Sequence, residues 1–166
     1  MPDITFSESG MTFCYPDTDL FRIEESPTYE SLGRKVKICE AIVAKSGKVI
    51  LIEAKSSFSK PGNKEDFRKN IEDIYEKFLY SLLLYTGILI DRPYTKKTTI
   101  SHKLSISAIK GSEIHCRLII KGFKPEWLSP VNEAIQLRCH LLRRVFSIDS
   151  VLVIDDSRAR KKGLIV

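Results

Sequence analysis

Two glutamates and a lysine lie at a spacing that could bind a divalent metal ion. Glu40, Glu53 and Lys55 fall in two apolar runs, residues 36–44 and 48–55, that are rich in β-branched side chains. Carboxylate oxygens are the ligands that Mg²⁺ prefers, and a lysine beside such an ion adds positive charge where phosphoryl oxygens become more negative. These residue types therefore point to phosphodiester hydrolysis.

A tight hairpin is the element that would bring these residues together. Ser46 and Gly47 separate the two runs and are residue types that a two-residue hairpin loop accepts. In that register the numbers of paired residues sum to 93, so Glu40 lies directly opposite Glu53. Lys55 shares the face of Glu53, because side chains on a strand repeat every second residue.

The predicted face around the two glutamates is largely apolar, since it also carries Ile38, Ile42 and Leu51. Facing like charges destabilise a strand pair, and partial burial raises the pKa of a carboxyl group further. We therefore expect a positive group nearby, either Lys55 or a bound cation.

A simpler interpretation stays open. Glu53 and Lys55 could form an ordinary ion pair on a solvated hairpin, with Glu40 paired to Lys37 or Arg34. An acid two residues before a lysine is also a common pattern, so the prediction depends on its place at the end of an apolar strand.

The run Ile38-Cys39-Glu40, followed by Ile52-Glu53-Ala54-Lys55, resembles the core of the PD-(D/E)xK nuclease superfamily. That superfamily includes restriction endonucleases, Holliday-junction resolvases and RecB-type nucleases. Glu40 stands where the family usually has aspartate, and Cys39 replaces the preceding proline. The resemblance covers about twenty residues closely and residues 28–90 loosely.

This resemblance implies a site for Mg²⁺ or Mn²⁺. Glu40 and Glu53 would be metal ligands, together with the backbone carbonyl of Ala54, and Lys55 would orient or activate the attacking water. Glu30 is the candidate for a further glutamate that some members carry on the helix before the first core strand. Many nucleases with such a core act as homodimers, and that assembly is implied here too.

Charge is distributed unevenly along the chain. The net charge is +6, yet residues 1–33 carry one basic and seven acidic side chains, so residues 34–166 are strongly basic. A basic surface attracts nucleic acid, here DNA first of all. The residues expected to line the approach to the site are Lys60, Lys64, Arg68 and Lys69. Each could equally belong to a solvated helix face.

Composition narrows the class of protein. The chain has 166 residues and 43% hydrophobic content, which predicts one globular domain. Its four cysteines lack metal-ligand spacing, so reduced thiols, with Cys39 and Cys139 in the core, are expected. The absence of a secretory pattern and of a long apolar span predicts a cytoplasmic protein that does not enter the membrane.

The remaining elements follow from periodicity. Residues 63–87 predict a long helix whose buried stripe includes Phe67, Ile71, Ile74, Phe78, Leu82 and Tyr85. Ser129-Pro130 predicts the start of a later helix, with Pro130 at its first position. The other expected elements are short strands at 4–6 and 11–15, a partly helical segment at 18–32, a second hairpin of 104–109 with 114–121, and a final strand at 151–154.

Together these elements predict an α/β fold with a single mixed β-sheet flanked by helices, in a restriction-endonuclease-like arrangement. The single nuclease-like domain, 1–166, would comprise an acidic segment at 1–33, the hairpin and long helix carrying the site at 34–90, and a second hairpin, helix and terminal strand at 100–166. Only two antiparallel strands can be placed before the long helix. A third would come from the N-terminal segment, or residues 103–121 would complete the sheet.

Three functional classes fit these observations. The first is a metal-dependent nuclease. The second is a non-catalytic nucleic-acid-binding module, in which Glu40, Glu53 and Lys55 form only a charge network. The third is an interaction or assembly component that docks through its acidic N-terminal segment. Metal dependence separates the first class from the other two.

Overall fold

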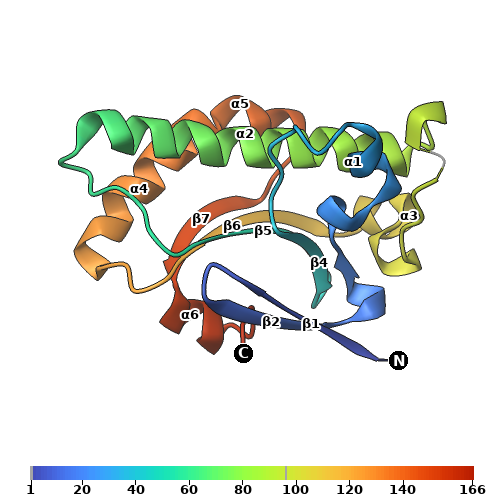
Figure 1. Ribbon diagram of the computed structural model, residues 1–166, viewed down its shortest axis with the longest axis horizontal. Coiled ribbons are helices and arrows are strands. Elements are labelled where there is room, and N and C mark those ends of the chain that lie inside the picture. The colour runs from blue at the N-terminus through green and yellow to red at the C-terminus, as the bar shows by residue number, and fades with distance from the viewer. Residues whose placement is uncertain (1, 96) are drawn as a thin grey trace.

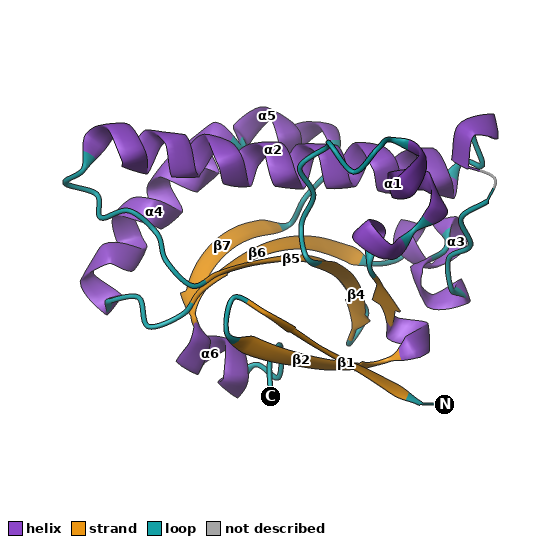
Figure 2. Cartoon of the chain, viewed as in Figure 1, coloured by secondary structure: helices purple, strands orange, loops and turns teal. Residues whose placement is uncertain are grey.

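A mixed sheet of five strands forms the centre of the computed structural model, which describes residues 2–95 and 97–166. Its strands follow the order β3 (Leu20–Phe21), β4 (Ala41–Lys45), β5 (Lys48–Lys55), β6 (Glu113–Ile120) and β7 (Ser150–Asp155). Helices cover one face, and the hairpin of β1 (Asp3–Glu8) and β2 (Met11–Pro16) lies against the other, beside α6 (Asp156–Lys161) (Figures 1 and 2). The predicted α/β class with a mixed sheet and helices is confirmed, but the prediction of a single sheet is wrong, because β1 and β2 form a separate two-stranded sheet.

The β4–β5 hairpin has the predicted register. Ser46 and Gly47 both adopt positive φ angles, 51° and 73°, as a two-residue type I′ loop requires. Ala41 pairs with Ile52, and the amide of Glu40 donates a 2.9 Å hydrogen bond to the carbonyl of Ile52. Regular pairing begins at residue 41, later than expected. From Ala41 to Lys45 the numbers of paired residues sum to 93 as predicted, whereas the amide of Glu40, just ahead of β4, bonds to Ile52 and does not continue this register to Glu53.

Helix α2 (Lys64–Leu89) is the predicted long helix. Five residues of its predicted stripe are buried against the sheet, namely Ile71, Ile74, Phe78, Leu82 and Tyr85, and Phe67 packs partly buried beside them. The helix connects β5 to β6, which lies parallel to β5 as such a crossover permits. Across the two described stretches, no helix combines the length and apolarity needed to cross a membrane.

The predicted second hairpin is wrong. Residues 106–110 form the short helix α3 (Ile106–Lys110), after a single turn of 3₁₀ helix at His102–Leu104. β6 instead pairs in parallel with both β5 and β7. Its residues are buried on both faces of the sheet, so its apolar run is typical of a central parallel strand. Gly111, which suggested a hairpin turn, follows the last residue of α3, where glycine commonly ends a helix.

The predicted start of the later helix is also wrong. α4 (Pro125–Arg138) begins at Pro125, and Pro130 lies inside it. Either Pro125 or Pro130 could occupy the first helical position, where a missing N–H costs nothing. Pro125, the earlier of the two, occupies it. The sequence also predicts an inner face of Ile135, Cys139, Leu142 and Phe146. Ile135 and Cys139 are buried, as is Leu142 on the following helix α5 (His140–Val145), whereas Phe146 after α5 is partly buried against the core.

The N-terminal segment supplies both predicted short strands and the missing third strand. β1 and β2 form their own two-stranded sheet, whose Phe6 and Phe13 pack beneath the main sheet. β3 pairs antiparallel with β4, so three antiparallel strands precede α2. The helical part of 18–32 consists of 3₁₀ turns at Asp17–Asp19 and Ile23–Glu25 and the short helix α1 (Pro27–Ser31).

Candidate metal and phosphate site

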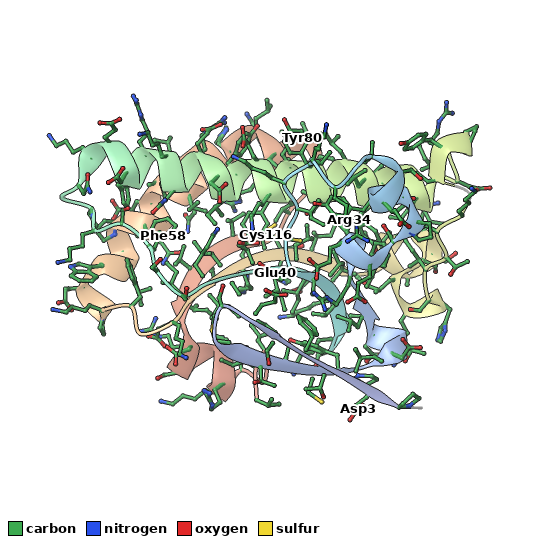
Figure 3. All side chains as sticks on the ribbon, in the orientation of Figure 1. Asp3, Arg34, Glu40, Phe58, Tyr80 and Cys116 are labelled. Atoms are coloured by element: carbon green, nitrogen blue, oxygen red, sulfur yellow. The ribbon has the colours of Figure 1, made fainter. Side chains whose placement is uncertain are left out.

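The two glutamates lie where the β4–β5 hairpin meets the helix layer. Glu40 immediately precedes β4 and Glu53 lies on β5, and their neighbours Ile42 and Leu51, which pair with each other, pack into the core beneath α2. Glu53 has no exposed surface, whereas the side chain of Glu40 is 14% exposed. Figure 3 shows Glu40 near the middle of the molecule, close to the β1–β2 hairpin. A fully buried carboxylate therefore lies next to one that reaches the surface.

The positive group expected beside them comes from α2. The Nζ atom of Lys77 lies 2.7 Å from Oε1 of Glu53 and 3.9 Å from Oε1 of Glu40. Lys77 is itself 17% exposed at its side chain, so this ion pair is well shielded from water. One ammonium group thus contacts both facing carboxylates.

Lys55 belongs to the same network and reaches its edge. Its Nζ atom lies 3.6 Å from Oε1 of Glu53 and 3.2 Å from Oδ2 of Asp73, and 29% of the side chain is exposed. The other oxygen of Asp73, Oδ1, lies 3.2 Å from Nζ of Lys37, which also pairs with Glu76 at 2.6 Å. The paired aspartate therefore holds Lys55 at the surface end of the buried charges.

Burial is the main influence on protonation here. It raises the pKa of Glu40 to about 7; the charge of Glu53 acts in the same direction, and Lys77 opposes it. Burial also raises the pKa of Glu53, although Lys77 and Lys55 favour its ionised form. The pKa of Asp73 is lowered, because Lys55 and Lys37 outweigh its partial burial.

One oxygen of the site lacks a partner. Oε2 of Glu53 is buried and makes no hydrogen bond within the part of the chain that the structure describes. The carbonyl of Ala54 accepts a 3.0 Å hydrogen bond from the hydroxyl of Ser9, at the turn of the β1–β2 hairpin. A partnerless carboxylate oxygen beside a second carboxylate is a donor set that suits a hard cation, so these residues fit Mg²⁺ or Mn²⁺.

Glu40 also takes part in a second acidic group that the sequence analysis missed. Ligand oxygens of Glu8, Glu24 and Glu40 all lie within 4.8 Å of one another. Arg22 lies between the first two, with Nη2 3.3 Å from Oε1 of Glu8 and in contact with Glu24. Glu30, the weaker sequence candidate, is exposed on α1 and is not part of this group.

An open cleft of about 400 Å³ leads to the exposed end of this network. Its lining residues are Lys55, Ser57, Phe58, Ser59, Asn70 and Asp73. The cleft lies where β5 ends, at the carboxyl edge of the parallel strands, which is where ligands bind in many α/β proteins.

The predicted nucleic-acid-binding residues are dispersed. Lys60 lies over the ring of Trp127, with Nζ 5.3 Å from the ring centroid. Lys69 pairs with Glu65 at 2.9 Å, while Lys64 and Arg68 are exposed on the first turns of α2. Of the four, Lys60 is therefore the one whose contacts lie beside the cleft.

Sequence reasoning also missed Asp73 and Lys77. Both belong to a polar line on α2 that runs beside the apolar stripe at spacings of three, four and four residues: Asn70, Asp73, Lys77 and Ser81. Asn70 accepts from the amide of Ser59, and Ser81 accepts from the amide of Cys39. Polar residues repeating at helical spacing along the edge of a buried stripe were the signal in the sequence.

Comparison with known proteins identifies no relative: no family model matches the sequence, and no curated protein or solved structure matches the chain.

Proposed function

We propose that this protein is a divalent-metal-dependent nuclease that hydrolyses phosphodiester bonds, with DNA as the first substrate to test. The observation that carries the proposal is the fully buried Glu53. Among the described residues one of its oxygens has no hydrogen-bond partner, its other oxygen shares the ammonium group of Lys77 with Glu40, and a partly exposed Lys55 lies next to it. Burying an acid in this way costs stability, which is common where a site serves chemistry.

The order of elements supports the proposal. Three antiparallel strands, β3 to β5, precede α2 and a parallel β6, which resembles the core order of the PD-(D/E)xK superfamily. Glu53 and Lys55 lie on the third of these strands and Glu40 immediately precedes the second, near the positions that the resemblance implies. One departure is that α1 lies between β3 and β4 and not before both.

Each residue can be given a role. Glu40 and Glu53 would hold the metal, which when bound lowers the pKa of a coordinated water and neutralises phosphate charge. The ammonium group of Lys55 would face the scissile phosphate and the attacking water from the cleft side, held in place by Asp73. Lys77 would keep the carboxylate pair ionised and would share it with the bound metal.

The ion pair between Lys77 and Glu53 also supports a second function. The ammonium group of Lys77 compensates Glu53 at 2.7 Å without any metal, as a purely structural charge network would require. The protein would then be a nucleic-acid-binding module that does not cleave. Its binding would depend on salt and would be unaffected by removal of divalent ions.

Cleavage assays separate the two functions. Supercoiled plasmid, single-stranded DNA and structured RNA would each be incubated with Mg²⁺ or Mn²⁺, and in parallel with EDTA. Lys55→Ala is the test variant, and Lys110→Ala, an exposed lysine on α3, is the matched control. We expect metal-dependent cutting by the wild type and the control and none by Lys55→Ala.

Cutting by Lys55→Ala at the wild-type rate would show that a contaminant or another site is responsible. Binding without cutting under every metal condition would favour the second function. Glu53→Gln gives an independent check, because it keeps the shape of the side chain and removes its charge.

A further inference from the structure

An aromatic and basic cluster continues from the rim of the cleft. Phe58, a lining residue, meets Phe123 edge-on with ring centroids 6.1 Å apart, and Phe123 meets Trp127 at 5.3 Å. Phe58 lies in the loop after β5, and Phe123 in the loop after β6. Figure 3 shows Phe58 at the end of the molecule where α4 begins. The two loops thus bring the cleft and Trp127 together.

Two lysines from these loops converge on Trp127. Nζ of Lys60 lies 5.3 Å and Nζ of Lys124 lies 5.0 Å from the ring centroid. Both lysines are exposed, and within the described residues neither forms an ion pair with a carboxylate. Glu126, in the first turn of α4, is the acidic residue closest in sequence. Two uncompensated positive charges beside an aromatic ring suit a phosphate chain with an unpaired base.

We propose that Lys60, Trp127 and Lys124 form a subsite for an unpaired nucleotide and its flanking phosphates, next to the cleft that contains Lys55. The inference rests on the proposed function, because it assigns a single strand of nucleic acid as the ligand. The base stacks on the indole ring, and the ammonium groups move from the ring to the phosphates. The strand then runs from Trp127 past Phe58 to Lys55.

The structural alternative is that the lysines simply cover a ring that would otherwise meet water. Lysine stems commonly cover apolar surface in this way. That role predicts no response of the indole to nucleic acid. It also predicts that neutralising the lysines leaves affinity for single strands unchanged.

Trp127 is the one tryptophan in the chain, so its fluorescence reports on this subsite directly. The full-length protein in EDTA, where cutting cannot occur, would be titrated with thymidine and uridine oligonucleotides and with a duplex of equal length. The variants are Lys60→Gln and Lys124→Gln, with Lys110→Gln as the matched control. All three replace exposed lysines and should leave the fold intact.

We expect single strands to quench the fluorescence and the duplex to quench it much less, because paired bases cannot stack on the ring. Each variant should weaken binding severalfold. Each should also lower the slope of log affinity against log salt by about 0.7, the contribution of one phosphate contact on a single strand. The control should keep the wild-type slope. Comparison of the two oligonucleotides shows whether the strand is DNA or RNA.

Absence of quenching by any single strand would overturn the subsite, as would equal quenching by the duplex. Unchanged affinity and salt slope in both variants would overturn it too. The cleavage assay is separate: metal-dependent cutting without quenching would refute the subsite and keep the nuclease. Quenching without cutting would keep the subsite and refute the nuclease.

Discussion

Replacing Glu40 by glutamine should change how the stability of the protein depends on pH. Burial and the charge of Glu53 raise the pKa of Glu40 from 4.5 to about 7. The folded protein therefore holds a proton that the unfolded chain has already released between these two values. Stability falls with rising pH wherever the folded state binds more protons, so this carboxyl group contributes a loss of stability from about pH 4.5 to pH 7.

The size of the effect follows from the same shift. Each pH unit between the two pKa values corresponds to about 1.4 kcal/mol, so the rise from 4.5 to about 7 amounts to about 3 kcal/mol. Only 14% of the Glu40 side chain is exposed, so solvent screening reduces this value little. Glutamine matches the protonated form in shape and does not titrate. The variant should equal the wild type near pH 4 and exceed it by about 3 kcal/mol near pH 8.

The measurement is urea unfolding followed by circular dichroism, in EDTA, at several pH values from 4 to 8. Glu65→Gln is the control, because the Glu65 side chain is 74% exposed on α2 and forms a surface ion pair with Lys69. Its replacement should change stability by less than about 0.5 kcal/mol at every pH. Parallel curves for Glu40→Gln and the wild type would refute the buried carboxylate pair. If Glu40→Gln instead becomes less stable than the wild type as pH rises, Glu40 forms an ordinary surface ion pair.

Three further predictions concern the same core. Lys77→Met should lose about 3 kcal/mol of stability at pH 7 in urea unfolding, since the buried Glu53 loses the ammonium group that compensates it, and adding Glu53→Gln should recover much of this loss; additive losses would argue against the pair. Phe78→Ala, at a fully buried position of α2, should lose about 4 kcal/mol, and the exposed Leu83→Ala less than about 1 kcal/mol; equal losses would contradict the packing of α2. Mg²⁺ at a hundred times its dissociation constant should stabilise the wild type by about 2.7 kcal/mol at pH 8 and stabilise Glu40→Gln much less; equal stabilisation of both would place the metal elsewhere.

Much of the candidate site could be predicted from the sequence because a tight hairpin is a local structure. The Ser46-Gly47 turn and the alternation of apolar residues fixed which residues face each other. That was enough to bring Glu40 close to Glu53, to place Lys55 on the same face as Glu53, and to predict a nearby positive charge. The long helix was equally clear, because its apolar stripe repeats over many turns.

The second half of the sheet could not be predicted in the same way. A short apolar run has the same pattern in a hairpin and in a central parallel strand, and the choice depends on whether both faces are covered. The helices on one face and the β1–β2 hairpin on the other bury most of β6, which only the packing of distant segments reveals. The start of α4 was ambiguous in a similar way, because either Pro125 or Pro130 could occupy the first position of the helix. The structure shows that Pro125 does.

The sequence alone thus determined that the two carboxylates and their lysine lie close together and that a long helix follows, because turn chemistry and side-chain periodicity act over a few residues. Only the tertiary structure decided what surrounds them. It placed Lys77 and Asp73 of α2 over the pair, and Glu8 and Glu24 beside Glu40. These contacts join residues 16 to 37 positions apart, and their geometry depends on how α2 and the N-terminal segment pack on the two sides of the sheet. Local patterns carry no information about that packing.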